Sequence, residues 1–168
     1  MYKVNVMAKL AINGGEPVRK HLFPAYNTIG DAEKKAVMQV LVSGNLSQYL
    51  GAWTGDFFGG PAVRSFEAAW KETIGIKHAV SVNSNTSGLF ASMGAIGIQP
   101  GDEVIVSPYS MSASALAPLI YGGIPVFADI DPVTLCMDPD SIEAQITQRT
   151  KAILIVHIMG HPANMDRV

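Results

Sequence analysis

The sequence has few of the residues from which many kinds of functional site are built. It contains one cysteine, Cys136, among 168 residues, which excludes a disulfide framework and a four-thiolate zinc site. Four histidines are the other candidate ligands, so the sequence provides little material for a metal site. Twelve lysines and arginines against 14 aspartates and glutamates give a net charge of −2. This balance excludes a basic nucleic-acid-binding surface as the main function, and it excludes an acidic disordered tail.

Segments that would direct the chain to or through a membrane are also missing. Residues 1–10 lack the basic stretch, long apolar run and small-residue cleavage site of a secretory signal. The two longest runs without charge, residues 79–101 and 104–128, are interrupted by glycine, proline and serine. Neither supplies the roughly 20 mostly apolar residues of a membrane-spanning helix. We therefore expect a soluble, cytoplasmic protein.

Charge is nearly absent from one long stretch. Residues 79–128 contain only two charged residues, Asp102 and Glu103. Segments that are covered on both faces have this composition, as in a parallel sheet flanked by helices. The core of a helical bundle is the alternative, but the short runs rich in β-branched residues argue against it. The stretch therefore predicts an α/β domain.

Hydrophobic periodicity and turn residues divide the chain into alternating elements. Helices are expected over residues 31–43, 62–74, 87–96 and 112–121, and strands over residues 78–82, 103–107, 125–129 and 152–157. Asp138 followed by Pro139 predicts the start of another helix, with the aspartate as its N-cap. Strands that alternate with helices indicate βαβ units and a mainly parallel sheet.

The two ends of the chain differ in organisation. Residues 1–29 contain several helix breakers and no regular pattern, so we expect an irregular N-terminal arm followed by one domain over residues 30–168. The last residues combine a buried type of strand with a helix-start signal at residues 164–166, immediately before Val168. Complete α/β domains rarely stop at such a point, so we expect a truncated domain.

A small polar segment, residues 83–87, lies between an expected strand and an expected helix. Backbone N–H groups at a helix N-terminus bind phosphate well, and the hydroxyls of Thr86 and Ser87 add donors. The same residue types are also ordinary helix caps. The common glycine-rich phosphate and dinucleotide fingerprints are absent. From the residues alone, both the phosphate-binding and the capping interpretation stand.

Four segments in order, residues 78–89, 97–106, 123–132 and 150–157, carry a family resemblance. Together they closely resemble the DegT/StrS family of pyridoxal-phosphate-dependent sugar aminotransferases. The resemblance continues upstream through Phe66-Glu67 and Gly44, so that it covers roughly residues 10–168. It implies the aspartate-aminotransferase-like fold (fold type I), of which this chain would hold the N-terminal part of the cofactor-binding large domain.

The resemblance also implies which residues contact pyridoxal 5'-phosphate. The family's phosphate-binding turn usually reads Asn-Ser-Gly-Thr-x-Ala-Leu, and here Asn85 takes the glycine position, Thr86 the threonine position and Ser87 the position that follows. Asparagine tolerates unusual backbone angles better than most residues. We therefore expect Asn85, Thr86 and Ser87 to hold the phosphate.

Two further residues match family positions near the cofactor ring. Met111 takes the place of an aromatic residue over the pyridine ring, and a thioether can contact a ring through its sulfur. Core packing is the other interpretation of Met111. His157 matches a histidine of the family's Val-His-x-x-Gly segment, where it would support the cofactor site. A core or turn histidine is the other interpretation of His157.

The family's Schiff-base lysine and the aspartate that pairs with the pyridine nitrogen are expected beyond Val168. None of the eight lysines in the sequence matches the catalytic position. The chemistry needs a lysine to hold the cofactor and move a proton, and an acid to keep the ring an electron sink. We therefore expect no catalytic residue within this chain and no amino transfer by the chain alone.

The resemblance implies a ping-pong reaction in the complete protein. Glutamate or glutamine would donate an amino group to a keto-sugar, often nucleotide-linked, or to a keto-cyclitol. It also implies a homodimer with active sites at the subunit interface. The aromatic-rich loop over residues 44–60, with Tyr49, Trp53 and Phe57, would then face the substrate or the second subunit. A hydrophobic loop packed on its own domain is the alternative.

Other functions remain open beside the aminotransferase. Some relatives carry histidine in place of the lysine and catalyse sugar dehydration with a pyridoxamine cofactor. A non-catalytic subunit that pairs with a longer homologue is a second alternative. A nicotinamide-binding domain is disfavoured because the sequence lacks the glycine fingerprint of that class.

Overall fold

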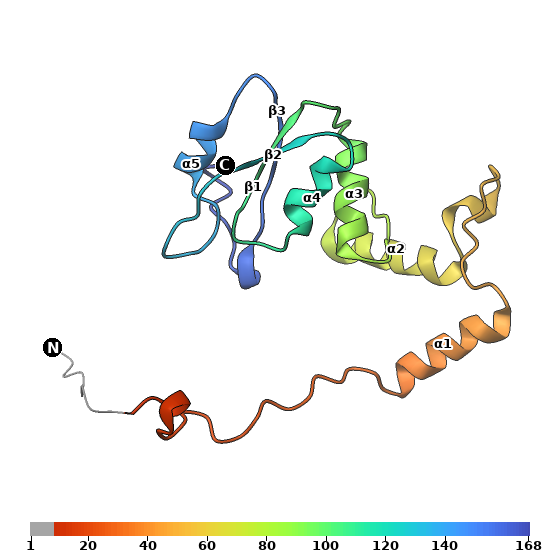
Figure 1. The fold of residues 1–168 in the computed structure, drawn as a ribbon. Coiled ribbons are helices and arrows are strands. Elements are labelled where there is room, and N and C mark those ends of the chain that lie inside the picture. The colour runs from red at the N-terminus through yellow and green to blue at the C-terminus, as the bar shows by residue number, and fades with distance from the viewer. Residues whose placement is uncertain (1–8) are drawn as a thin grey trace. The chain divides into compact units, whose positions relative to one another are not determined.

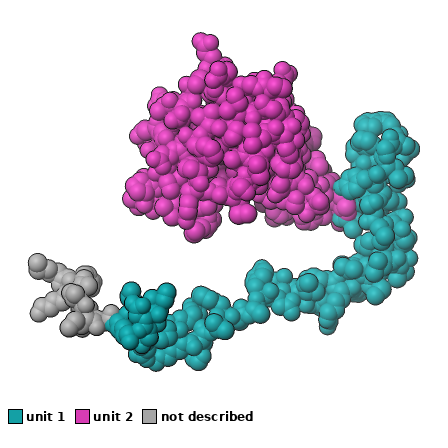
Figure 2. All heavy atoms as spheres, viewed as in Figure 1, with its two compact units in different colours: residues 1–62 teal, residues 63–168 magenta. Residues whose placement is uncertain are grey.

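The computed structural model describes residues 9–168. Its internal contacts divide the chain into two compact units, Met1–Ala62 and Val63–Val168, which Figure 2 shows in different colours. The first eight residues of the expected N-terminal arm lie outside the described residues. The expected boundary between arm and domain after residue 29 stays a prediction.

The first unit contains the short 3₁₀ helices η1 (Ala11–Asn13) and η2 (Gly55–Phe58) and the helix α1 (Asp31–Ser43). α1 has the bounds that the sequence predicts. The carboxylate of Glu33 accepts a hydrogen bond from the Gly30 backbone N–H at 2.7 Å where the helix begins, and Gly44 ends it in a left-handed conformation. No residue of α1 is buried, and Val37 and Leu41 on its apolar face are 60% and 55% exposed.

The second unit is built around a parallel sheet (Figure 1). Its elements are α2 (Pro61–Ile74, which begins at the end of the first unit), α3 (Asn85–Ala95), β1 (Glu103–Val106), α4 (Ala113–Leu119), β2 (Ile124–Phe127), α5 (Pro139–Gln145), β3 (Thr150–Leu154) and η3 (Ile158–Gly160). The strand order is β2-β1-β3, and β1 pairs in parallel with both neighbours. The α/β class and the parallel sheet are therefore confirmed.

The cap predicted for α5 is confirmed. Asp138 has an extended backbone, and its carboxylate accepts a hydrogen bond from the Asp140 backbone N–H at 3.1 Å. Pro139 occupies the first helical position, where a missing N–H costs nothing.

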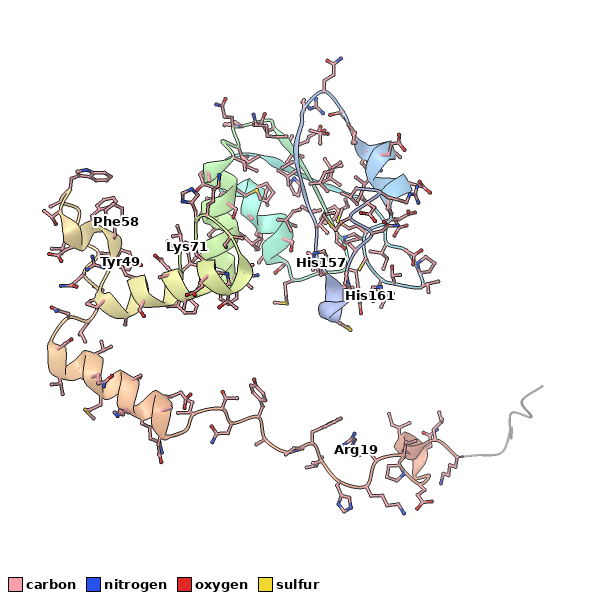
Figure 3. The ribbon with its side chains drawn as sticks, turned by 180° about the vertical axis from the view of Figure 1, so that it is seen from behind. Arg19, Tyr49, Phe58, Lys71, His157 and His161 are labelled. Atoms are coloured by element: carbon pink, nitrogen blue, oxygen red, sulfur yellow. The ribbon has the colours of Figure 1, made fainter. Side chains whose placement is uncertain are left out.

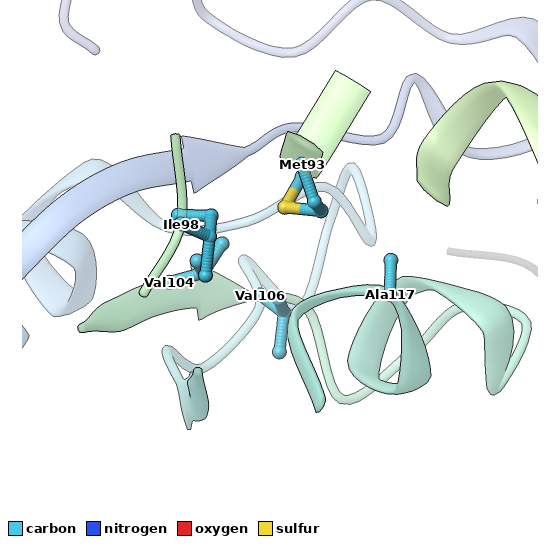
Figure 4. Close-up of a cluster of buried hydrophobic side chains, with 5 residues drawn as sticks. All are labelled: Met93, Ile98, Val104, Val106 and Ala117. Carbon is cyan, nitrogen blue, oxygen red and sulfur yellow. The ribbon is translucent and has the colours of Figure 1, made fainter. Parts of the chain in front are cut away.

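The core lies on both faces of β1, where Val104, Ile105 and Val106 are fully buried. On one face, the buried side chains of Val104 and Val106 gather with those from α3, α4 and the loop before β1 (Figure 4): Met93, Ile98 and Ala117. On the other face, Ile105 packs with Ala128 and with residues from α5 and the segment before it: Met137 and Ile142. Coverage on both faces thus holds for β1, and the helical-bundle alternative is wrong.

The predicted strand over residues 78–82 is wrong. These residues form no pairing with the three-stranded sheet, and Val80 is 83% exposed. A strand requires a neighbouring backbone to accept and donate its hydrogen bonds, and alternating apolar residues cannot supply that neighbour. Residues 165–167 form a turn in which the Arg167 backbone N–H donates to the Asn164 carbonyl at 3.2 Å, and the helix start expected at residues 164–166 stays a prediction. Across residues 9–168, no helix has both the length and the apolar character needed to cross a membrane.

A buried carboxylate holds the beginning of the sheet. Glu103, which is 4% exposed, accepts hydrogen bonds from Thr147 Oγ1 at 2.5 Å and from Arg149 Nε at 2.8 Å, and it pairs with Arg149 Nη2. The hydrogen bond from Thr147, and then that from Arg149, hold the pKa of the Glu103 carboxyl below its ordinary value of 4.5. These bonds join the first residue of β1 to the segment that leads into β3.

Replacing this carboxylate should lower stability in a pH-dependent way. A lowered pKa in the folded state means that the contribution of Glu103 is complete above about pH 4.5 and is lost as the pH falls through the folded-state value. We expect Glu103→Gln to lower the free energy of unfolding at pH 7 and to weaken its decrease on acidification. Urea unfolding between pH 7 and about pH 3 measures both effects.

The matched control is Glu143→Gln, which changes an exposed glutamate on α5. It should leave the free energy of unfolding at pH 7 close to that of the unchanged chain. Equal stability of the Glu103→Gln variant and the unchanged chain at pH 7 would contradict the role given to Glu103.

Candidate functional site

The carboxyl edge of the sheet gathers the loops that carry the predicted site residues. Because β1 and β3 are parallel, the segment after Val106 and the segment after Leu154 leave the sheet at the same edge. α3 packs beside α4 (Figure 1), and the segment that follows α3 lies by the start of β2, since a Cβ added at Gly123 would lie 2.8 Å from the Ile98 side chain. The first turn of α3 therefore points toward the carboxyl edge.

Ser84 organises that first turn. It is the N-cap of α3, and its hydroxyl accepts the Ser87 backbone N–H at 3.1 Å and lies 3.0 Å from the Ser87 hydroxyl. The backbone N–H groups of Asn85 and Thr86 have no acceptor within residues 9–168. The first turn also contains no acidic residue. Two unpaired amides, hydroxyl donors and the positive end of a helix dipole fit a phosphate group.

Asn85 needs no unusual backbone at this position. It is the first residue of α3, and its φ lies outside the left-handed region. Asparagine in place of the family's glycine therefore introduces no backbone strain. Asn85 and Thr86 are exposed and Ser87 is half-buried, so the structure brings the three predicted residues together in one turn. Their contact with a phosphate stays a prediction.

Met111 lies in the loop between β1 and α4. It is 78% exposed, which is incompatible with the core-packing interpretation in this structure. Hydrogen bonds on either side shape the loop: the Ser107 hydroxyl accepts the Tyr109 backbone N–H at 3.1 Å, and the hydroxyls of Ser110 and Ser114 lie 3.0 Å apart. The loop thus presents the thioether at the surface, where it is available to a ligand.

His157 closes the loop that follows β3. Its Nδ1 accepts a hydrogen bond from the Ala163 backbone N–H at 3.0 Å, and Ala163 is 6% exposed. Figure 3 shows the His157 side chain at η3, with His161 at the other end of that short helix. An accepting Nδ1 leaves the proton of the neutral ring on Nε2. This is the turn role that the sequence left open, and cofactor contact by His157 stays a prediction.

Two residues that shape the site were missed as site residues. Ser84 has a sequence signal, because a serine that precedes the helical residues is a typical N-cap. Glu67 on α2 accepts hydrogen bonds from both the backbone N–H of Ser81, at 2.7 Å, and the Ser81 hydroxyl, at 3.0 Å. Residues that lie 14 positions apart share no local periodicity, so no pattern in the sequence could have paired them.

The aromatic-rich loop belongs to the first unit. The rings of Trp53 and Phe57 lie 4.6 Å apart between centroids, and those of Phe57 and Phe58 lie 5.2 Å apart. Tyr49 packs so closely on Gly59 that a Cβ there would lie 2.8 Å from its ring, and Gly59 also has a φ of +82°. Figure 3 labels Tyr49 and Phe58 in this loop. The loop packs on itself, yet Trp53 remains 82% exposed.

An α/β sheet with a phosphate-compatible helix terminus at its carboxyl edge defines a class of cofactor-binding domains. Comparison with known proteins narrows this class. Residues 28–168 match the DegT/DnrJ/EryC1/StrS aminotransferase family, and the chain belongs to that family. Its fold is the fold type I of pyridoxal-phosphate-dependent aminotransferases, and pyridoxal phosphate is the family's cofactor.

Two curated relatives illustrate the match. The chain is 43% identical over 151 residues to the spore coat polysaccharide biosynthesis protein SpsC of Bacillus subtilis. The matched region covers 89% of this chain and 36% of SpsC. It is 40% identical over 160 residues to the L-glutamine:2-deoxy-scyllo-inosose aminotransferase of Streptomyces lividus. That match covers 94% of this chain and 36% of the relative. The chain thus spans about a third of the length of these relatives.

Solved structures agree with this assignment. An aminotransferase from Psychrobacter cryohalolentis superimposes with a TM-score of 0.76 at 35% identity, covering 87% of this chain and 35% of that one. The E. coli GDP-4-keto-6-deoxy-D-mannose-3-dehydratase with bound hydrated PLP superimposes with a TM-score of 0.72 at 33% identity, covering 85% and 36%. The family resemblance, the fold type and the cofactor expected from the sequence are confirmed.

Removing the cap at Ser84 should destabilise α3. Ser84→Ala leaves the Ser87 backbone N–H without its acceptor, and we expect the free energy of unfolding to fall by about 1 kcal/mol. Urea denaturation followed by circular dichroism measures this change.

Ser92→Ala is the matched control on the same helix, since the Ser92 hydroxyl donates to the Gly88 carbonyl and caps nothing. It should change the free energy of unfolding by less than about 0.5 kcal/mol. Equal losses in the two variants would show that Ser84 does not act as a cap.

Proposed function

We propose that this chain is the phosphate-binding part of an aminotransferase that moves an amino group from glutamine or glutamate to a keto-sugar or keto-cyclitol. One observation carries the proposal. The first turn of α3 contains no acidic residue, and at the carboxyl edge of the sheet it presents the backbone N–H groups of Asn85 and Thr86, which have no acceptor among residues 9–168. Such a turn suits the phosphate of pyridoxal phosphate.

The relatives support the nature of donor and acceptor. The Streptomyces lividus relative is named for glutamine as donor and for 2-deoxy-scyllo-inosose, a keto-cyclitol. A second Bacillus subtilis relative, 39% identical over 115 residues, is named for glutamate and 3-oxo-glucose-6-phosphate. Both acceptors are polyhydroxylated ketones, so we propose the same chemical class for this protein.

The residues of this chain are proposed to bind the phosphate of the cofactor and to orient its ring. The amides of Asn85 and Thr86, with the hydroxyls of Thr86 and Ser87, donate hydrogen bonds to the phosphate, and the Ser84 cap keeps the amides aligned. The exposed Met111 thioether would contact the ring, and His157 holds the loop after β3 by accepting the Ala163 backbone N–H. When bound, the cofactor supplies the carbonyl group and the electron-withdrawing ring that amino transfer requires.

The residue that links covalently to the cofactor is proposed to lie outside this chain. On the resemblance, we infer that none of the lysines in these 168 residues takes the family's catalytic position: Lys3, Lys9, Lys20, Lys34, Lys35, Lys71, Lys77 and Lys151. The aspartate that pairs with the pyridine nitrogen is likewise proposed to lie beyond Val168. The chain alone would then bind the cofactor without transferring an amino group.

Binding of pyridoxal phosphate should depend on its phosphate. We expect the 168-residue chain to bind pyridoxal phosphate at least about tenfold more tightly than pyridoxal, because only the former reaches the amides of α3 with a charged acceptor. Fluorescence or absorbance titration of the purified chain measures both dissociation constants, and inorganic phosphate should compete.

Equal affinity for the two compounds would contradict the assignment of residues 83–87.

Glutamine and 2-deoxy-scyllo-inosose added to the loaded chain should give no amino product. In a protein that also carries the cofactor lysine, the same mixture should yield the aminated cyclitol. Loss of a sugar hydroxyl without gain of an amine would instead identify a dehydratase, the activity named for the E. coli structure. A chain that binds no cofactor but co-purifies with a longer homologue would identify a non-catalytic subunit.

We also propose a homodimer, supported by exposed apolar surface in the first unit. α1 presents Val37 and Leu41 to solvent, and the aromatic loop presents Trp53. Exposed apolar surface of this kind marks interaction sites.

Sedimentation equilibrium should show a dimer, and Trp53→Ala should raise the dimer dissociation constant by about tenfold, as expected for an aromatic anchor. The control Val133→Ala, at an exposed position of the second unit, should leave the dimer unchanged, and a monomeric unchanged chain would refute the proposal.

A further inference from the structure

One carboxylate holds the segment that leads into the phosphate turn, which comprises Ser84 and the first turn of α3 (residues 84–87). Glu67 lies on α2, and its Oε1 accepts the Ser81 backbone N–H at 2.7 Å and the Ser81 hydroxyl at 3.0 Å. Both residues are half-buried. Two hydrogen bonds to one ionised oxygen are stronger than bonds between neutral groups. The contact therefore attaches residue 81 firmly to α2.

Little else holds the backbone of this segment. Between residues 77 and 83, the amide of Ser81 is the one backbone N–H that has an acceptor within the described chain, residues 9–168. The segment belongs to no strand, and Val80 and Val82 are 83% and 47% exposed. In a strand, a neighbouring backbone would accept the hydrogen bonds of this segment; here the Glu67 side chain accepts the one from Ser81.

The anchored residue lies directly before the turn. Ser81 is three positions ahead of Ser84, the N-cap of α3, and Val82 touches the position where a Cβ of Gly88 would lie, at 3.4 Å. The path of residues 81–84 sets where the chain enters α3. A change at Glu67 would therefore alter how the amides of Asn85 and Thr86 are presented.

We propose that Glu67 is a positioning residue for the phosphate turn, an inference that rests on the proposed cofactor-binding function. It touches no ligand itself. It removes conformational freedom from residues 77–83 before the ligand arrives, so that less ordering has to accompany binding.

The test compares Glu67→Ala, Glu67→Gln and the control Glu72→Ala, which changes an exposed glutamate on the same helix. The probes are pyridoxal phosphate and pyridoxal, titrated against each purified chain. We expect Glu67→Ala to weaken pyridoxal phosphate binding by about tenfold and pyridoxal binding by less than about twofold. Glutamine retains an oxygen that can accept both bonds, so Glu67→Gln should restore affinity to within about threefold.

The outcomes separate this inference from the function on which it rests. If the unchanged chain binds both probes equally, the proposed function fails. If the unchanged chain prefers pyridoxal phosphate but Glu67→Ala keeps that preference, or loses affinity for both probes alike, Glu67 is only a structural tie and the inference is wrong. If Glu67→Ala does not fold, Ser81→Ala decides. Ser81→Ala removes one of the two hydrogen bonds to Glu67. It should lower the affinity for pyridoxal phosphate about threefold and leave the affinity for pyridoxal unchanged.

Discussion

β1 lies in the middle of the sheet, hydrogen-bonded to β2 on one side and to β3 on the other, and its central side chains are fully buried. Burying a strand on both faces removes its apolar side chains from water while its neighbours satisfy its backbone. This arrangement fixes the directions of α3 and α4, which pack on one face, and of α5, which packs on the other. The loops after the strands are then brought to one edge of the sheet, where polar groups can remain unpaired.

The polar network around Glu103 and the first turn of α3 lie at opposite ends of the sheet. At the amino end of β1, Thr147 and Arg149 satisfy a buried carboxylate. At the carboxyl edge, the amides of Asn85 and Thr86 are left without an acceptor in the described chain. The polar groups at the amino end are hydrogen-bonded and join β1 to the segment before β3. The two amides at the carboxyl edge are free to bind a ligand. The residues that stabilise the sheet are thus kept apart from the unpaired amides at which we propose the phosphate to bind.

Much of this fold follows from local sequence signals. The bounds of α1 and the cap at Asp138 could be predicted, because helix termini need specific side chains within a few positions. The polar segment 83–87 was correctly placed at a helix start, although α3 begins at Asn85 and not at the expected residue 87. The strand expected over residues 78–82 failed because a strand depends on a partner that lies elsewhere in the chain. The contact between Glu67 and Ser81 could not be predicted for the same reason, since it joins residues 14 positions apart.

The sequence by itself determined the family, through four segments in order along the chain, and it determined the bounds of α1 and the cap of α5, because helix ends depend on residues close together in the sequence. Only the tertiary structure decided the role of individual side chains. It presented Met111 at the surface, gave His157 a hydrogen bond to Ala163, and attached Ser81 to Glu67. The physical reason is that exposure and long-range hydrogen bonds are properties of packed elements. The same local sequence can be buried, exposed or anchored depending on what folds against it.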